Sequence, residues 1–148
     1  MKRLLWITFL MLVTISCQTK SVPKTDSELI EGNWALAVFK NDPTTTGTLA
    51  LKADKTFSGS MSSEKLKKTS LISGHFALSR KKVESKDVLF VDFVIETMEG
   101  KPANSGMGMH LFYDPEHNLL RDLLMLAYAR PEELEQARAS LNSSPPSK

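Results

Sequence analysis

The chain contains one cysteine, Cys17, among its 148 residues, and this scarcity excludes several kinds of chemistry. One thiol cannot form a disulfide within the chain, and a cysteine-based zinc site needs several thiolates. Long apolar runs are lacking too. The apolar stretch at residues 4–15 spans only 12 residues, whereas a helix needs about 20 to cross a bilayer. The sequence therefore predicts neither a disulfide-stabilised fold nor a membrane-spanning helix.

The residues before Cys17 have the order of an export signal. Lys2 and Arg3 supply positive charge, a short apolar segment follows, and small residues precede the cysteine. This pattern predicts a signal peptide over residues 1–16 that is removed from the mature protein. The alternatives are an ordinary secretory signal with an unmodified cysteine nearby, and an uncleaved anchor.

The segment Thr14-Ile15-Ser16-Cys17 resembles the lipobox of bacterial lipoproteins, although that family usually has leucine at the place of Thr14. The resemblance implies that the thiol of Cys17 carries a diacylglycerol and that Cys17 becomes the new N-terminus. An acylated cysteine leaves no free thiol, so thiol catalysis is excluded. Gln18, and not aspartate, follows the cysteine, and the resemblance to Gram-negative lipoproteins then implies transfer to the outer membrane. We therefore expect a lipid-anchored protein of the bacterial cell envelope, on the outer membrane and facing the periplasm.

Neither sign of charge dominates once the signal is removed. The full chain has 19 basic and 17 acidic residues, and residues 1–16 hold two of the basic residues and no acid. The mature part therefore carries 17 residues of each sign, which gives no reason to expect a nucleic-acid partner. A Gly-x-Ser-x-Gly nucleophile motif is also missing. We predict a non-enzymatic protein with no catalytic residue and no cofactor.

Composition divides the mature chain into three parts. Residues 17–26 are polar and predict a flexible, lipidated tether. Residues 27–141 predict one folded domain, because about 115 residues suffice for a single core. Residues 142–148 are rich in serine and proline and predict a disordered tail.

Short segments of alternating apolar and polar residues dominate the domain, as expected of β-strands with one buried face. The expected strands are residues 33–40, 47–52, 56–61, 71–79, 88–97, 107–113 and 119–130. In the first of them, Trp34, Leu36 and Val38 share a face. Residues 62–68 and 80–87 are expected to be polar or charged loops. The pattern favours an all-β fold, an antiparallel barrel or sandwich, and we expect a small barrel of seven or eight strands.

Helical segments are expected at both ends of the domain. Asp26 or Ser27 is suited to cap a short N-terminal turn. Pro131, followed by acidic residues, predicts the start of a C-terminal helix. Residues 119–130 are ambiguous, because their leucine content suits a helix. They follow a hairpin turn and end at a proline, which favours the last strand of the barrel.

Three short motifs resemble the lipocalin-like small barrels found among bacterial lipoproteins. They are Gly32-Asn33-Trp34, the strand–turn–strand segment 47–57, and residues 73–78. The resemblance implies that Trp34 closes the base of the barrel and that Arg130, after the last strand, stacks on its indole ring. The Thr-Asp-x-Tyr motif of lipocalins is absent, and the nearest pair, Tyr113-Asp114, has the reverse order.

Lipocalin-like barrels commonly enclose a small apolar ligand, and the resemblance implies that role here. The residues expected to line the cavity are Trp34, Phe57, Phe76, Phe93, Met109 and Leu111. The alternative is a structural or interaction module whose barrel these same side chains fill, because small barrels are just wide enough for them. The leading expectation is a membrane-anchored protein that binds a small hydrophobic ligand or another envelope component.

Residues 106–110 form the sharpest candidate for metal binding, because thioethers and imidazole suit Cu(I). Met107 and Met109 share a strand face, however, whereas His110 points to the opposite one. Core packing of the methionines is the favoured interpretation. No metal site is therefore predicted, and a periplasmic copper-binding protein is a lesser alternative.

Overall fold

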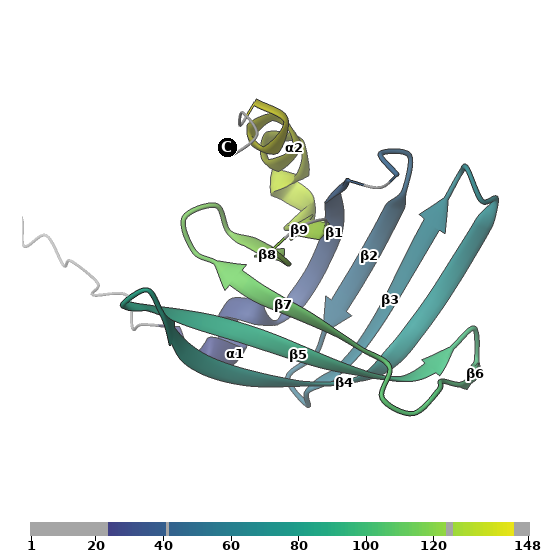
Figure 1. Cartoon of the computed structure of the whole chain (residues 1–148), viewed down its shortest axis with the longest axis horizontal. Coiled ribbons are helices and arrows are strands. Elements are labelled where there is room, and N and C mark those ends of the chain that lie inside the picture. The colour runs from purple at the N-terminus through teal and green to yellow at the C-terminus, as the bar shows by residue number, and fades with distance from the viewer. Residues whose placement is uncertain (1–23, 41, 124–125, 144–148) are drawn as a thin grey trace, which may run out of the picture.

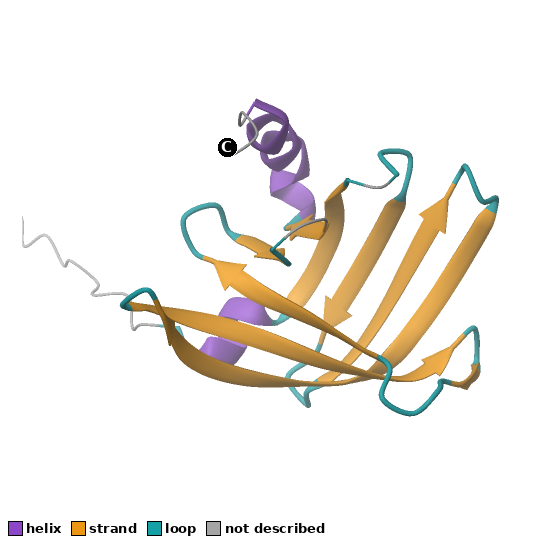
Figure 2. Cartoon of the chain, in the orientation of Figure 1, coloured by secondary structure: helices purple, strands orange, loops and turns teal. Residues whose placement is uncertain are grey.

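The computed structural model describes residues 24–40, 42–123 and 126–143. Its strands are β1 (Gly32–Phe39), β2 (Thr46–Leu51), β3 (Thr56–Ser63), β4 (Lys68–Val83), β5 (Lys86–Met98), β6 (Lys101–Pro102), β7 (Gly108–Asp114), β8 (Leu119–Arg121) and β9 (Leu126–Ala129). Among the described residues, eight of these strands pair as antiparallel neighbours and close into a barrel (Figure 1 and Figure 2). Closure comes from the β4–β5 and β1–β9 pairings, and β6 extends the edge of β5. The predicted all-β barrel is confirmed.

The barrel has two different ends. The helix α1 (Asp26–Ile30) precedes β1 at one end, which we call the closed end. The opposite end, which carries the β1–β2 and β3–β4 turns, we call the mouth (Figure 1). Thr25 caps α1, since its hydroxyl accepts from the Glu28 amide and the Glu28 carboxylate accepts from the Thr25 amide at 2.7 Å. This capping box replaces the predicted cap at Asp26 or Ser27.

A bulge in β1 changes which residue faces the interior. The register with β9 shifts between Leu36 and Val38, so Val38 pairs with Ala127 on the outer face. Phe39 takes the inward position and packs against the core. The prediction that Val38 follows Trp34 and Leu36 into the core is therefore wrong, because strict alternation fails where one strand carries an extra residue.

The β4–β5 hairpin is longer than the sequence suggested. Residues 80–87 were predicted to be a loop, yet β4 continues to Val83 and β5 begins at Lys86. Only Glu84 and Ser85 form the turn, and both have positive φ angles, 48° and 70°, as two-residue hairpin turns require. Charged side chains gave a loop signal, but ladder hydrogen bonds join backbone atoms and continue wherever the partner strand continues.

The leucine-rich segment 119–130 forms two strands, so the prediction of one continuous strand is wrong. β8 and β9 form a hairpin in which the Asp122 amide donates to the Leu126 carbonyl at 3.0 Å. Leu120 and Tyr128 face the barrel core, whereas Leu119 and Ala129 face outward beneath a helix. Both faces are thus buried, which explains why the segment lacks a period-two pattern.

A second, smaller core lies outside the barrel. The 3-10 turn η1 (Pro131–Glu133) leads into α2 (Leu134–Ser143), which confirms the predicted C-terminal helix. Ala137 of α2 packs with Ala37, Leu119 and Ala129 on the outer face of the barrel. In the part of the chain that the structure describes, no helix is both long and apolar enough to cross a membrane.

Candidate functional site

The closed end is sealed by Trp34 and α1. The indole ring is fully buried, and its Nε1 donates a hydrogen bond to the carbonyl oxygen of Ile30, the last residue of α1, at 2.8 Å. Tyr113 meets the ring edge-on, with centroids 6.5 Å apart. Because the indole nitrogen has a partner, the whole side chain can be removed from water without an unsatisfied donor.

Arg130 covers the other side of the indole, as the resemblance to lipocalins implied. Its guanidinium carbon lies 3.9 Å from the ring centroid of Trp34. Nη1 donates to the Glu31 carbonyl and Nη2 to the Leu29 carbonyl, both at 2.8 Å. These carbonyls belong to the C-terminal end of α1, where the helix dipole favours a cation. Burial lowers the pKa of Arg130, and the charge of the nearby Glu132 carboxylate acts in the opposite direction.

Gly32, the first residue of the Gly-x-Trp motif, makes room for this arrangement. Its φ angle is +110°, and a Cβ atom there would lie 2.8 Å from Nη1 of Arg130. We expect Gly32→Ala to lower the free energy of unfolding by about 1–3 kcal/mol, measured by urea denaturation. Gly100→Ala is the matched control, since φ is +74° and no atom lies within 4 Å of a Cβ. An equal loss in both variants would contradict a role for the Arg130 contact.

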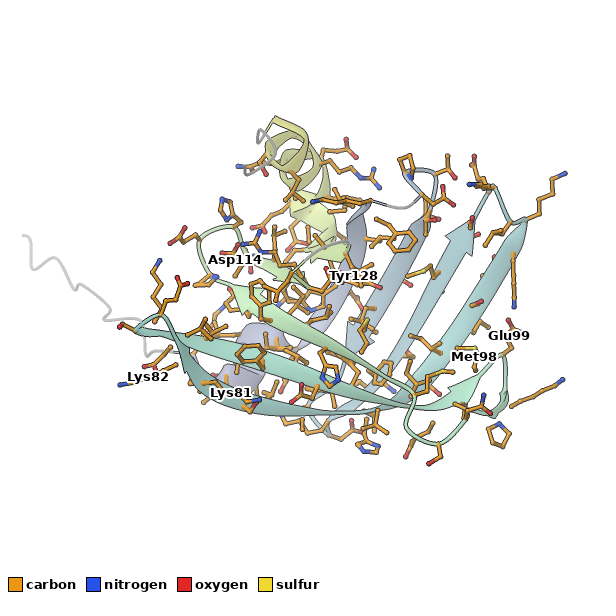
Figure 3. All side chains as sticks on the ribbon, viewed as in Figure 1. Lys81, Lys82, Met98, Glu99, Asp114 and Tyr128 are labelled. Atoms are coloured by element: carbon orange, nitrogen blue, oxygen red, sulfur yellow. The ribbon has the colours of Figure 1, made fainter. Side chains whose placement is uncertain are left out.

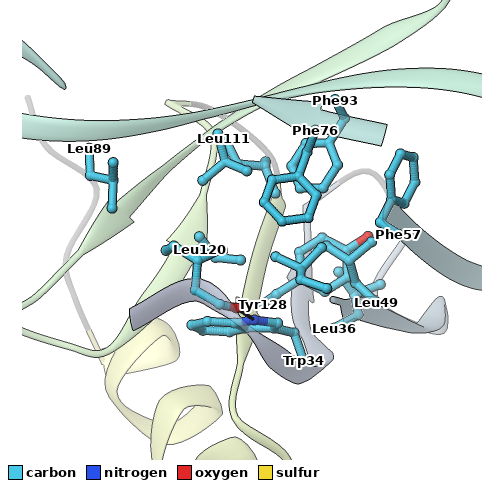
Figure 4. Packing of buried hydrophobic residues seen from close by; sticks show 13 residues of the cluster. Trp34, Leu36, Leu49, Phe57, Phe76, Leu89, Phe93, Leu111, Leu120 and Tyr128 are labelled. Atoms are coloured by element: carbon cyan, nitrogen blue, oxygen red, sulfur yellow. Dashed lines mark hydrogen bonds between the residues drawn. The ribbon is translucent and has the colours of Figure 1, made fainter. Parts of the chain in front are cut away.

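The six residues predicted to line a ligand cavity all face the interior, but they fill the barrel near its closed end. Figure 4 shows five of them within the packed cluster, and the sixth, Met109, packs against that cluster. The rings of Phe57 and Phe93 meet edge-on at 5.0 Å, and Phe76 lies 5.9 Å from Phe93. All six except Met109, which is partly exposed, have at most 3% of their surface exposed. Burial also raises the pKa of the nearby Tyr128 to about 12. This packing leads us to seek ligand contact elsewhere.

A pocket of about 310 Å³ lies at the mouth. Its lining consists of inward-facing strand residues and residues of the two adjoining turns: Phe39, Asp42, Thr45, Met61, Ser63, Lys65, Leu66, Lys68 and Ser70. The side chains of Phe39, Met61 and Leu66 make its apolar part, and Leu66 is 71% exposed. Lys65 and Lys68 border the same pocket. The arrangement offers an apolar surface beside two ammonium groups.

Asp42 fixes the β1–β2 turn at the edge of this pocket. Its carboxylate accepts hydrogen bonds from the hydroxyls of Ser63 and Thr44, both at 2.6 Å, and from the Thr44 amide at 3.1 Å. These donors, the Ser63 hydroxyl first, lower the pKa of Asp42 to about 2. The carboxylate therefore stays charged at neutral pH and links the β1–β2 turn to the end of β3.

A larger hollow, of about 790 Å³, lies on the outer face of β1–β4. It is bordered mostly by small outward side chains such as Ala35, Ser58 and Ser60, together with Leu71, which is 57% exposed. Of the six predicted ligand residues, only Trp34 borders it. This hollow is separated from the barrel interior by the sheet itself.

The residues considered for copper do not converge. Met109 packs against the barrel core, whereas Nδ1 of His110 lies 2.8 Å from Oδ1 of Asp92 on the outer face. The two side chains therefore point to opposite sides of β7. Among the described residues, no group of three or more His, Cys, Asp or Glu side chains could hold a metal ion. Cys17, the predicted lipidation site, lies outside the described residues.

Sequence reasoning missed Phe39, Met61 and Leu66 as mouth residues. The bulge in β1 conceals the inward position of Phe39. The alternation in residues 56–61 predicts that Met61 shares the inward face of Phe57, as β3 has it, but Met61 was not among the predicted ligand residues. Leu66 lies in a lysine-bearing turn and gave no periodic signal.

No protein-family model, curated protein or solved structure matches the chain.

Proposed function

We propose that this protein is a lipid-anchored lipoprotein of the bacterial envelope that binds a small amphipathic molecule at the mouth of a lipocalin-like barrel. The observation that carries the ligand proposal is the mouth pocket of about 310 Å³, which falls at the small end of the range for ligand sites. The anchor proposal rests on the signal pattern that ends at Cys17.

The chemistry of the pocket supports a ligand with an apolar body and an anionic head. Phe39 and Met61 offer apolar surface inside the barrel wall. Lys65 and Lys68 border that surface, and Lys68 also pairs with Glu99 at 2.9 Å. A carboxylate head placed at the rim would meet these ammonium groups while its hydrocarbon part enters the pocket.

The filled interior sets how deep a ligand reaches. Phe57, Phe76 and Phe93 occupy the barrel beneath the mouth. A bound molecule therefore inserts one end only, and its remainder stays near the turns. The same packing favours the second candidate function, an interaction module whose barrel holds no ligand.

Binding of parinaric acid, a fluorescent fatty acid, tests the proposal. Met61→Glu places a carboxylate in the pocket, where it repels an anionic head and replaces apolar surface, and we expect it to weaken binding by about tenfold or more, equivalent to about 1.4 kcal/mol. Leu71→Glu is the matched control, because Leu71 pairs with Ser60, the neighbour of Met61, and points outward. Thermal unfolding of both variants checks that they fold. An absence of saturable binding by the unmodified chain would favour the interaction module.

A further inference from the structure

We propose that the tip of the β4–β5 hairpin rests on the anionic lipid surface to which the chain is anchored, so that the mouth faces away from that membrane. The surface concerned, which we call the hairpin patch, consists of Lys81, Lys82, Val83, Lys86 and Phe90. This inference rests on the proposed lipid anchor at Cys17, and the experiment below separates the two.

The hairpin patch lies at the closed end of the molecule. β4 ends and β5 begins there, and Figure 1 shows the hairpin turn at the opposite side of the barrel from the β1–β2 and β3–β4 turns. Every residue from Arg80 to Asp87 is exposed, including Val83, which is 45% exposed. Figure 3 shows Lys81 and Lys82 at this end, far from Met98 and Glu99.

An ion pair ties this hairpin to the start of the folded domain. Nε of Arg80 donates to both carboxylate oxygens of Asp26, at 3.0 and 2.9 Å. Asp26 is the first residue of α1, and the chain that leads back to Cys17 joins two residues earlier, at Lys24. Lys24 lies seven positions after Cys17, and seven extended residues reach at most about 25 Å. The tether therefore holds the hairpin near the lipid surface.

The charge of the patch suits anionic headgroups. Arg80 is paired with Asp26. The remaining charged side chains of residues 81–87 are three lysines and two acids, which gives this part of the hairpin a small positive net charge. They are Lys81, Lys82, Lys86, Glu84 and Asp87. Basic side chains close to a membrane are attracted by its anionic lipids over about one Debye length. Among the other acidic residues of the closed end, Glu28, Glu31 and Glu132 border a separate hollow together with Lys24 and Arg130, and Asp54 lies in the β2–β3 turn between Lys52 and Lys55.

Aromatic rings extend the patch along the outer face of β5 and β7. Phe90 and Phe112 lie side by side, with ring centroids 6.4 Å apart. The ammonium group of Lys81 covers Phe90 at 5.3 Å, and the guanidinium of Arg121 covers Phe112 at 5.3 Å. Cations beside apolar rings are typical of surfaces that lie in the headgroup region, where the ring meets acyl chains and the charge meets phosphate.

The orientation has a consequence for the proposed ligand site. β1 and β3 run from the closed end to the mouth, so Phe39 and Met61 lie at the far end from α1 and the hairpin patch. With the patch on the membrane, the mouth opens toward the aqueous compartment. The ligand would then enter from that compartment or from another carrier, and not directly from the anchoring membrane.

The experiment uses the acylated chain reconstituted into vesicles of phosphatidylcholine with phosphatidylglycerol, with headgroup-spin-labelled lipid as a quencher. A fluorophore is attached to a cysteine introduced by Ser85→Cys at the hairpin turn or by Glu64→Cys at the mouth. We expect quenching at position 85 to exceed that at position 64 by about twofold or more, because the tip lies within the headgroup layer. Adding Lys81→Glu, Lys82→Glu and Lys86→Glu should remove this difference while co-flotation with vesicles persists.

Equal quenching at both positions, or quenching that the three substitutions leave unchanged, would overturn the orientation. Failure of the acylated chain to float with vesicles would instead refute the anchor. In that case the chain from residue 17 with Cys17→Ser still tests the patch. It should sediment with phosphatidylglycerol vesicles at low salt and lose that binding at high salt or with the three glutamates. Salt-independent or absent sedimentation there would reject the patch on its own.

Discussion

Replacing Trp34 with alanine is expected to lower the free energy of unfolding by about 3–5 kcal/mol. The indole is fully buried, and its removal leaves a cavity between α1, Tyr113 and the barrel core. It also removes the ring beneath Arg130, whose guanidinium then covers an empty space. Since the free energy of unfolding of a small domain is only about 5–15 kcal/mol, this loss is a large part of the stability of the domain. Urea denaturation followed by far-ultraviolet circular dichroism measures it without relying on indole fluorescence.

Phe112→Ala provides the control for Trp34→Ala. Phe112 also lies beneath a guanidinium, that of Arg121 at 5.3 Å, but it is only partly buried on the outer face. We expect its removal to cost about 1 kcal/mol, because less surface returns to water and no closed cavity forms. A similar cost for Phe112→Ala and Trp34→Ala would show that the closed end has no special importance for stability.

Gly74→Ala is expected to lower the free energy of unfolding by about 3 kcal/mol or more, because the new methyl group overlaps with backbone. A Cβ atom at this position would lie 2.0 Å from the Val94 carbonyl oxygen and 3.0 Å from the Glu96 amide nitrogen. The register between β4 and β5 shifts at this point, between Ser73 and Gly74. Backbone atoms cannot rotate away as a side chain does, so the strands must separate locally. Thermal and urea unfolding measure the loss.

Gly106→Ala is a suitable reference for Gly74→Ala. Gly106 has a φ angle of +82° and no atom within 4 Å of a Cβ, so alanine there suffers only from the backbone conformation. We expect a loss of about 1 kcal/mol in that variant. Should Gly74→Ala unfold at the same urea concentration as the unmodified chain, the close approach of β4 and β5 at the bulge would be disproved.

Much of the barrel could be predicted because its strands have one wet and one dry face. Leu49 and Leu51 in β2, and Leu89, Val91 and Phe93 in β5, are inward and buried as their spacing required. Prediction failed for strands that do not have one exposed and one buried face. β8 and β9 are covered on both faces, and the charged end of the β4–β5 hairpin is covered on neither. In both cases the periodic signal disappears while backbone pairing continues.

The candidate sites divide in the same way. Trp34 and Arg130 were paired in advance through the resemblance of Gly32-Asn33-Trp34 to a lipocalin motif, and their contact at 3.9 Å is present. The mouth pocket could not be predicted in this way, because the inward aromatic residues that were expected to line a cavity fill the barrel interior instead. Phe57, Phe76 and Phe93 lie on three neighbouring strands, and their rings pack against one another in the interior. Whether such rings fill the barrel or leave a space depends on barrel width and shear, which cannot be read from a local sequence pattern.

The sequence alone determined most strand faces, the C-terminal helix and the tight Gly-x-Trp corner, because each depends on neighbouring residues, and its N-terminal pattern predicts a lipid anchor. Only the tertiary structure decided which side chains fill the barrel and which line its mouth. It also brought Arg80 to Asp26, 54 positions apart, and so set the β4–β5 hairpin beside the start of the domain. Such contacts depend on where the β1 and β5 bulges shift the strand register, and those shifts follow from packing across the whole barrel.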